Sequence, residues 1–323
     1  MLDNIDYFLR LNRNSPLPFG GVQMIFFGDL FQIAPVISSD FERRYLYDNY
    51  ESPYFFSSHV LNREECDLHF RELHRVYRQQ DPAFINLLES IRLNQMDWDL
   101  LEELNSRYQP EEVQEGIYIT LSPRNIQVKR INEAKLQKLE GRLFTYKAGV
   151  LGEFPPTSYP TDYNLSLKAG AQVMFIRNDP DKRFVNGTLG TVVELDYDLI
   201  KVEIENTAGE KEIVEVNPEK WEHIRYYTNA TNPNDIETEV AGTFEQYPLK
   251  LAWAITIHKS QGKTFKNVIL DMGKKGAFTH GQTYVALSRC TSLEGLILKS
   301  PIKPADIMVD PVIVDYYENM RRF

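Results

Sequence analysis

The sequence has few of the features that define several large classes of protein. Only two of its 323 residues are cysteines, Cys66 and Cys290, which are too few for a disulfide framework or a zinc site. No apolar run approaches the ~18 residues of a membrane-spanning helix. The first residues do not resemble a signal peptide, because Asp3, Asp6 and Arg10 interrupt the apolar positions. We therefore expect a globular protein of the cytoplasm or the nucleus that has no membrane partner.

A complete phosphate-binding loop is also missing from the sequence. Such a loop has the pattern G-x-x-x-x-G-K-[ST]. Gly262-Lys263-Thr264 resembles its end, but Ile257 stands where the first glycine is required. No other segment fits the pattern, and no Asp-Glu pair that could hold magnesium ends a predicted buried strand. The sequence therefore lacks the elements that hold magnesium-ATP in P-loop enzymes.

The negative charge of the chain lies in one segment. The formal net charge of −10 argues by itself against a nucleic-acid partner. Residues 191–248 contain 14 acidic and 4 basic side chains, which is the whole excess, whereas residues 249–299 contain 8 basic and 2 acidic ones. The basic segment is compatible with an anionic partner, and equally with a charged face that contacts only water.

The chain is predicted to open with a helix and a buried strand. Apolar residues between Leu2 and Leu9 have helical spacing. The apolar run at residues 22–27 is typical of a parallel strand that is buried on both faces. Asp29 and Gln32 follow this run. Ligands of open α/β sheets bind beyond the carboxyl ends of the strands, so both are candidate site residues, although Asp29 could instead cap a short helix.

The rest of the chain alternates between predicted helices and strands, which is typical of α/β proteins. Helices are predicted at residues 84–91, 97–108, 128–139 and 284–288. Strands are predicted at residues 117–121, 267–270 and 295–299. Residues 149–160 are rich in glycine and proline and are predicted to form a linker or an exposed loop.

A run of short strands is predicted between these α/β segments. Its members are residues 171–176, 188–195, 200–205 and 212–216. Asn186-Gly187 favours a tight hairpin, and Ala208-Gly209 favours another turn. We predict a small antiparallel barrel that is inserted into an α/β domain.

Three polar clusters stand at or near the ends of predicted elements. They are Gly28-Asp29 with Gln32, Arg78-Gln79, and Ser288-Arg289. The rigid fork of an arginine suits phosphate oxygens, and an arginine aimed at a transferring phosphoryl group acts as an arginine finger. Each arginine alone would more often form a surface ion pair. The combination with a fourth cluster at residues 258–262 favours a functional site.

The fourth cluster follows an apolar run that begins at residue 251. Together with Thr256, two positions before it, its candidate members are His258, Lys259, Ser260, Gln261 and Gly262. Gly262 would allow a ligand to approach the backbone closely, Lys259 supplies a point charge, and Gln261 can bond phosphate or base edges. His258 taken alone is more often a structural histidine, and we assign it no acid or base role.

Four segments together resemble the motifs of superfamily-one helicases. GDLFQIAPV at 28–36, YRQQDPAFINLLESIR at 77–92, AITIHKSQGKTF at 254–265 and YVALSRCTSLEGL at 284–296 resemble motifs III, IV, V and VI. With FGG at 19–21 and the segment running from LKAGAQVMFIRND to FVNGTLGTV, they are similar to the RecD-like group, and most closely to the PIF (petite integration frequency) DNA helicases. Order and spacing agree over nearly the whole chain.

The resemblance implies ATP-driven movement along single-stranded DNA in the 5′-to-3′ direction, with ATP between two RecA-like domains. The residues implied to face the nucleotide are Gly28, Asp29, Gln32, Arg78, Gly262 and Arg289. Gln32 would sense the γ-phosphate, and Arg78 and Arg289 would be charge-stabilising fingers. Thr256 and residues 258–261 would lie along the DNA or couple it to the nucleotide.

The resemblance also implies a division into domains. The implied parts are the end of the first RecA-like domain at 1–60, the second RecA-like domain at 61–167 and 249–323, and an inserted SH3-like barrel at 168–248. The implied partner is single-stranded or forked DNA, with roles in DNA repair and recombination. We expect a monomer, which would be nucleoid-associated if cytoplasmic.

The sequence departs from the family pattern at its start. In the family, the P-loop and the magnesium-binding acids lie upstream of motif III, so we expect Met1 to stand where a longer polypeptide would continue. The chain would then be the C-terminal part of a helicase that lacks most of its first RecA-like domain. ATP and Mg²⁺ would belong to the full-length protein. This chain alone would bind neither tightly and would not hydrolyse ATP, because phosphoryl transfer needs the P-loop and the metal.

Two alternatives remain open from the sequence. The first is a nucleic-acid-binding or regulatory module that is derived from a helicase and has lost catalysis. The second is a P-loop kinase or ATPase that uses Gly262-Lys263-Thr264. A P-loop and an Asp-Glu motif in an upstream reading frame would favour the enzyme over the first alternative.

Overall fold

The computed structural model describes residues 1–37, 39–110, 116–206, 209–228 and 236–321. The chain divides into two compact units. Unit 1 consists of Met1–Gln109 and Lys274–Phe323, and unit 2 consists of Pro110–Gly273. Within the described residues, every helix is too short or too polar to cross a membrane.

Unit 1 is mainly helical. Its α-helices are α1 (Leu2–Arg13), α2 (Asp40–Asn49), α3 (Pro82–Arg92), α4 (Trp98–Asn105), α7 (Gln282–Leu287) and α8 (Pro311–Arg321). Its one named strand among the described residues is β14 (Leu296–Leu298), which forms a parallel bridge to Tyr108. The predicted helices of this unit and the strand near residues 295–299 are therefore confirmed.

Helix α3 illustrates how the sequence sets these elements. The Asp81 carboxylate accepts a hydrogen bond from Ala83 N at 3.0 Å, and Pro82 occupies the first turn, where its missing N–H is not needed. Its buried side chains recur at helical spacing; they are Phe84, Leu87, Leu88 and Ile91. Helix α3 packs against α7, and so segments from the two ends of the chain meet within unit 1.

The strand predicted at residues 22–27 is not present. These residues form no regular structure, and Ile25 and Phe27 are 68% and 87% exposed. A strand needs a neighbour that satisfies its N–H and C=O groups, and no strand of the described residues pairs with this segment. The prediction was wrong because apolar composition alone does not supply a sheet partner.

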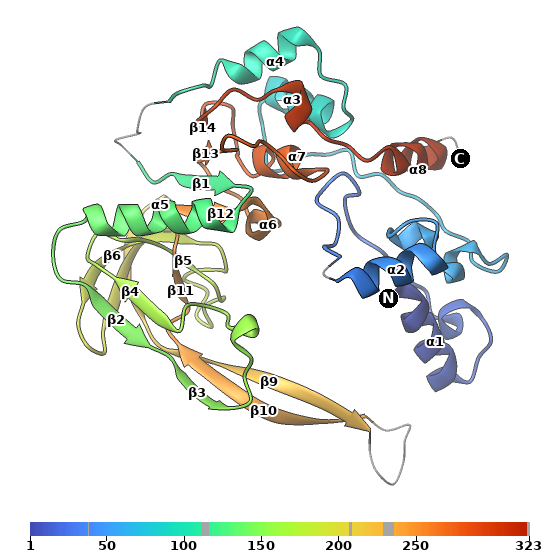
Figure 1. Ribbon diagram of the computed structural model, residues 1–323, viewed down its shortest axis with the longest axis horizontal. Helices are drawn as coiled ribbons and strands as arrows, with labels where there is room; N and C mark the ends of the chain where they lie inside the picture. Colours follow the sequence, from blue (N-terminus) through green and yellow to red (C-terminus); the bar gives the residue numbers. More distant parts are fainter. Residues whose placement is uncertain (38, 111–115, 207–208, 229–235, 322–323) are drawn as a thin grey trace. The chain divides into compact units, whose positions relative to one another are not determined.

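Unit 2 contains parallel strand pairing. The elements of this part are β1 (Ile119–Ser122), α5 (Asn125–Lys138), β12 (Ala254–Thr256), α6 (Ile257–Ser260) and β13 (Val268–Leu270). Strand β1 pairs in parallel with β12 and with β13, and α5 lies along β1 and β12 (Figure 1). Asn132 of α5 donates to Ala254 O at 2.9 Å and accepts from Ala254 N at 2.8 Å. Ser122 is paired with Thr256, so the carboxyl ends of two strands meet where α6 begins.

The remainder of unit 2 is antiparallel. Its strands are β2 (Phe144–Lys147), β3 (Gly149–Gly152), β4 (Asn164–Leu167), β5 (Gln172–Phe175), β6 (Leu189–Leu195), β7 (Ile200–Glu205), β8 (Lys211–Val216), β9 (Glu219–Thr228), β10 (Ile236–Gln246) and β11 (Leu249–Leu251). Five of them form a sheet in the order β11-β5-β6-β7-β8. Val173, Phe175 and Val202 are fully buried in its core. The four predicted short strands, and the antiparallel pairing between them, are confirmed.

The predicted loop at residues 149–160 begins instead with a strand. Strand β3 pairs with β10, which pairs with β9 in a long hairpin that was not predicted (Figure 1). A Cβ atom on Gly152 would lie 2.4 Å from Ala241 O, and one on Gly242 would lie 2.5 Å from Glu153 O. The prediction was wrong for residues 149–152, because Gly152 permits close approach of two backbones rather than marking a linker. Residues 153–160 contain no strand and are mostly exposed, as predicted.

The two predicted turns have different outcomes. Asn186-Gly187 lies in the connection between β5 and β6, and Gly187 has a φ of 109° that favours glycine. This connection spans residues 176–188, so it is longer than the tight hairpin that was predicted. At the second turn Gly209 N donates to Asn206 O at 2.9 Å, while Ala208 lies outside the described residues.

Candidate functional site

Three of the predicted polar clusters meet at one pocket of unit 1. The pocket has a volume of about 200 Å³, and its lining includes Gln32, Arg78, Gln79, Tyr284, Ser288 and Arg289. These residues come from the loop after residue 28, the segment before α3, and the end of α7. The fold therefore brings together side chains that are more than two hundred positions apart in the sequence.

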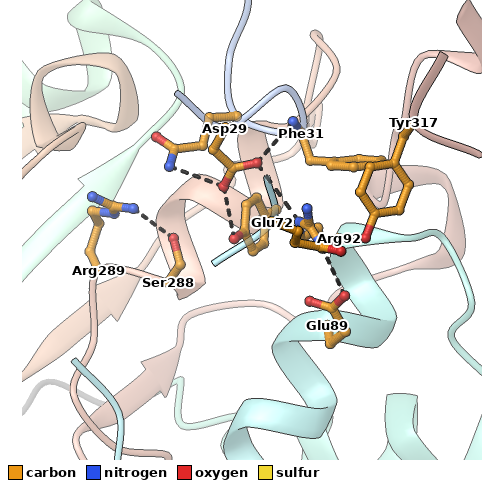
Figure 2. Close-up of polar contacts among 10 residues, drawn as sticks. Asp29, Phe31, Glu72, Glu89, Arg92, Ser288, Arg289 and Tyr317 are labelled. Atoms are coloured by element: carbon orange, nitrogen blue, oxygen red, sulfur yellow. Dashed lines mark hydrogen bonds and ion pairs between the residues drawn. The ribbon is translucent and has the colours of Figure 1, made fainter. Parts of the chain in front are cut away.

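Arg289 is buried in the wall of this pocket and is fixed by hydrogen bonds. Its residue is 1% exposed, its Nε donates to Val285 O at 2.9 Å, and its Nη2 donates to Ser288 Oγ at 2.8 Å (Figure 2). Burial and the positive charge of Arg78 lower the pKa of Arg289 to about 10. The guanidinium thus remains charged near neutral pH, in a place where an anion would be favourable.

Arg78 is anchored to the same backbone. Its Nη1 donates to Ser288 O at 2.9 Å, and Gln79 Nε2 donates to Ser288 O at 3.2 Å and to Cys290 O at 2.7 Å. Burial lowers the pKa of Arg78. Two guanidinium groups that share a pocket repel each other, and an anion between them would relieve this repulsion.

Asp29 organises the loop that carries Gln32. Its carboxylate accepts hydrogen bonds from Phe31 N at 3.1 Å, Gln32 Nε2 at 3.2 Å and Tyr284 Oη at 3.1 Å. Burial and the Asp29 carboxylate raise the pKa of Tyr284, so its hydroxyl remains a donor. Asp29 closes a turn rather than capping a helix, and exposed Gly28 lies before it. The orientation of the Gln32 amide is therefore set by Asp29.

The fourth cluster lies in unit 2. Thr256 Oγ1 accepts from Lys259 N at 3.4 Å and caps α6, and Ser260 Oγ donates to Ile257 O at 2.7 Å. Both hydroxyls belong to buried residues, whereas Lys259 and Gln261 are exposed. Burial lowers the pKa of His258. Gly262 is exposed, with a φ of 76°, and no atom lies within 4 Å of a Cβ placed on it. Within unit 2 the surface-facing members of this cluster are thus Lys259, Gln261 and Gly262.

Lys263 has a role that the sequence did not indicate. Its Nζ donates to Asn186 Oδ1 at 2.7 Å, and a Cβ atom on Gly187 would lie 3.2 Å from the same Nζ. Burial lowers the pKa of Lys263. This lysine therefore joins the β5–β6 connection to the segment after α6, an arrangement unlike the lysine of a phosphate-binding loop.

The described residues hold no ready-made cluster of metal ligands, and the Asp29 carboxylate is already engaged. They contain no group of three or more His, Cys, Asp or Glu side chains arranged to hold a metal ion. Both carboxylate oxygens of Asp29 accept hydrogen bonds, and Arg92 Nε lies 3.8 Å from Oδ1.

Comparison with known proteins agrees with the resemblance seen in the sequence. Residues 157–195 match the family description "DNA helicase Pif1, 2B domain". The chain is 30% identical to human ATP-dependent DNA helicase PIF1, covering 100% of this chain and 47% of the relative, and 30% identical to Pif1 of Bdellovibrio bacteriovorus, covering 95% and 64%. The chain thus spans about half to two thirds of the length of these curated relatives.

Solved structures give the same result. Bacteroides sp Pif1 in complex with ADP-AlF4 matches with a TM-score of 0.80 and 36% identity, covering 99% of this chain and 72% of that one. Bacteroides Pif1 bound to ssDNA matches with a TM-score of 0.75 and the same identity and coverage. Both relatives share the α/β fold with a parallel sheet. The chain therefore belongs to the Pif1 family of DNA helicases.

Proposed function

We propose that this chain supplies the arginine side of an ATP site and a DNA-binding surface in an ATP-dependent DNA helicase. The observation that supports this most strongly is the convergence of Gln32, Arg78 and Arg289 on one pocket of unit 1. Guanidinium groups held there in advance would stabilise the charge that develops on a transferring phosphoryl group. The Gln32 amide, oriented by Asp29, would contact the terminal phosphate or the attacking water.

The DNA-binding surface is proposed to include α6 and the residues after it. Lys259 and Gln261 are exposed there, and they suit phosphate oxygens and base edges. Thr256, Ser260 and His258 would support this surface or couple it to the nucleotide. Movement in the 5′-to-3′ direction on single-stranded or forked DNA follows from family membership as part of the same proposal.

Further parts of the proposal concern organisation. We infer that residues 168–248 form an SH3-like insertion between the two parts of a RecA-like domain at 61–167 and 249–323, and that residues 1–60 belong to another RecA-like domain. Magnesium and the P-loop would be supplied by a segment outside this sequence. A monomer in the cytoplasm, associated with the nucleoid, or in the nucleus would suit this function.

The proposal can be tested with the purified chain and with a protein that joins it to a segment carrying a P-loop and magnesium-binding acids (the joined protein). We expect the chain to bind fluorescent single-stranded DNA, measured by anisotropy, and to release no phosphate from magnesium-ATP. The joined protein should hydrolyse ATP when DNA is added. Turnover by the chain, verified by intact mass, would contradict the need for the P-loop, and failure to bind DNA would contradict the DNA-binding surface.

A second candidate is a DNA-binding or regulatory module without catalysis. It would be favoured if an upstream reading frame also lacked a P-loop and an Asp-Glu motif. The joined protein separates the two candidates. DNA-stimulated ATP hydrolysis that depends on Arg289 would support the enzyme, whereas DNA binding with no gain of hydrolysis would support the module.

A further inference from the structure

Arg92, at the C-terminal end of α3, lies among three carboxylates. Its Nη1 is 2.8 Å from Glu89 Oε1 and 3.7 Å from Glu72 Oε1, and its Nε is 3.8 Å from Asp29 Oδ1 (Figure 2). The side chain is only 15% exposed. Arg92 is thus a largely buried cation that neutralises acidic groups from three separate segments of unit 1.

Two aromatic rings also contact this guanidinium. Its central carbon lies 4.5 Å from the centroid of the Phe31 ring and 5.1 Å from that of the Tyr317 ring. The two rings pack edge to face with centroids 5.1 Å apart, and both residues are buried together with Ile313. A guanidinium against aromatic faces gains cation–π energy when water is excluded. Arg92 therefore contacts the Gln32 loop through Phe31 as well as Asp29.

Helix α8 completes the enclosure around Arg92. The Tyr317 hydroxyl donates to Glu72 Oε1, the same oxygen that faces Arg92. Arg321 Nε lies 3.6 Å from the other oxygen of Glu72. The C-terminal helix is therefore connected, through Tyr317 and Arg92, to the loop that presents Gln32.

We propose that Arg92 is a positioning residue that holds the Gln32 loop in place, with α8 as its support. What Gln32 does in the reaction rests on the proposed function, whereas the mechanical role of Arg92 does not. Arg92 is not among the residues that line the pocket, so it acts through Asp29 and Phe31 rather than on a substrate.

Charge explains why the loop should depend on Arg92. Burial lowers its pKa, but the carboxylates of Asp29 and Glu89 outweigh burial and raise the pKa above its ordinary value. If Arg92 is removed, the carboxylates of Asp29, Glu72 and Glu89 share a partly buried space with much less compensating positive charge. Like charges repel each other. Asp29 could relieve this by turning toward water, which would break its hydrogen bonds to Phe31 N and Gln32 Nε2.

Hydrogen exchange of the Phe31 and Gln32 backbone amides in this chain, followed by NMR, tests the proposal. Phe31 N donates to the Asp29 carboxylate and Gln32 N to Asp29 O at 3.2 Å. We expect Arg92→Ala to accelerate exchange of both amides by ~10-fold, and Arg92→Lys, which keeps the charge but not the planar fork, by only ~3-fold.

Arg107→Ala is the matched control, because Arg107 is another arginine of unit 1 that bonds to the backbone, at Leu296 O and Glu294 O. It should leave the Phe31 and Gln32 amides within about 2-fold of the parent rate. If Arg92→Ala does not fold, Tyr317→Leu should accelerate exchange of the same two amides, by a smaller factor. Unchanged exchange of Phe31 and Gln32 in folded Arg92→Ala or Tyr317→Leu would overturn the positioning role.

Kinetics of the joined protein distinguish this inference from the proposed function. With the loop loosened, Arg92→Ala should lower kcat for ATP by ~10-fold and change KM little, and Arg92→Lys should restore part of kcat. Faster exchange with an unchanged kcat would support the positioning role and contradict the assignment of Gln32 to catalysis. If Arg92→Ala reduces kcat while exchange of the two amides stays at the parent rate, only the positioning role is contradicted.

Discussion

The candidate sites of the two units differ in where their positive charge lies: it is buried in unit 1 and exposed in unit 2. In unit 1, Arg289 is a buried cation whose pKa is lowered to about 10 by burial and by Arg78. In unit 2, the charged member of the α6 cluster, Lys259, is exposed, and the buried members Thr256 and Ser260 are neutral. A buried cation is costly unless an anion compensates it, whereas an exposed lysine adds a small, salt-dependent increment to DNA binding. We therefore expect changes in unit 1 to affect one chemical step strongly, and changes in unit 2 to affect binding gradually.

The largest effect is expected for Arg289→Ala. Loss of the buried guanidinium should lower kcat of DNA-stimulated ATP hydrolysis in the joined protein by ~10³-fold, the lower end of what an arginine finger contributes. Phosphate release measures kcat, and anisotropy should show that DNA affinity is kept within about 3-fold. Arg289→Lys should remain strongly impaired because lysine lacks the fork. If Arg289→Ala hydrolyses ATP at the parent rate, the buried cation of unit 1 does not contribute to the chemical step.

Arg78→Ala should have the second largest effect. Arg78 is less buried than Arg289, so we expect kcat to fall by ~10²-fold in the same assay. Arg177, which lies in unit 2 and pairs with Glu219 at 3.0 Å, provides the control. Arg177→Ala should leave kcat unchanged, and equal losses from both variants would show that the effect of Arg78 is not specific.

Lys259→Ala should have a moderate effect that depends on salt. Removal of one phosphate contact should weaken binding of this chain to single-stranded DNA by ~3- to 10-fold and reduce the slope of log K against log salt by ~0.7. Anisotropy titrations at several salt concentrations measure both quantities. Lys220, in the acidic β9 segment, is the matched control, and a larger loss from Lys220→Ala would move the DNA-binding surface away from α6.

The smallest effect is expected from titration of His258. Burial lowers its pKa below 6.5 in the folded chain, so the unfolded chain binds more protons between that lowered value and 6.5. Stability should therefore be fully present above pH 6.5 and fall slightly as pH decreases through this window. Urea unfolding at about pH 7.5 and about pH 5.5 should show a smaller decrease for His258→Gln than for the parent. Equal decreases would show that His258 does not contribute.

The sequence predicted correctly the elements that have a local pattern. It failed where secondary structure depends on pairing with a segment that is distant in the sequence. The apolar positions of α3 and the alternating residues of β7 repeat with the period of the element, so both were located. The exposed segment at residues 22–27 and the strand β3 were misassigned, because the first lacks a pairing strand among the described residues and the second has one nearly a hundred positions away.

The candidate site shows the same division. Arg78 and Arg289 were found because arginines at the ends of elements indicate phosphate chemistry. Arg92 and Tyr284 were not singled out, although both lie inside the quoted motifs, because their function depends on Asp29, which is 63 and 255 positions away. The contact between Lys263 and Asn186 was missed for the same reason. Only the folded chain brings these residues together.

NMR of the arginine Nε–H groups during titration with inorganic tripolyphosphate can show whether Arg78 and Arg289 form one anion site in unit 1. We predict that the signals of Arg78 and Arg289 shift together with one dissociation constant, while the signal of Arg107 does not move. Arg78→Ala should weaken the response of Arg289. Separate dissociation constants for the two arginines, or no shift of either at saturating tripolyphosphate, would show that Arg78 and Arg289 do not share an anion site.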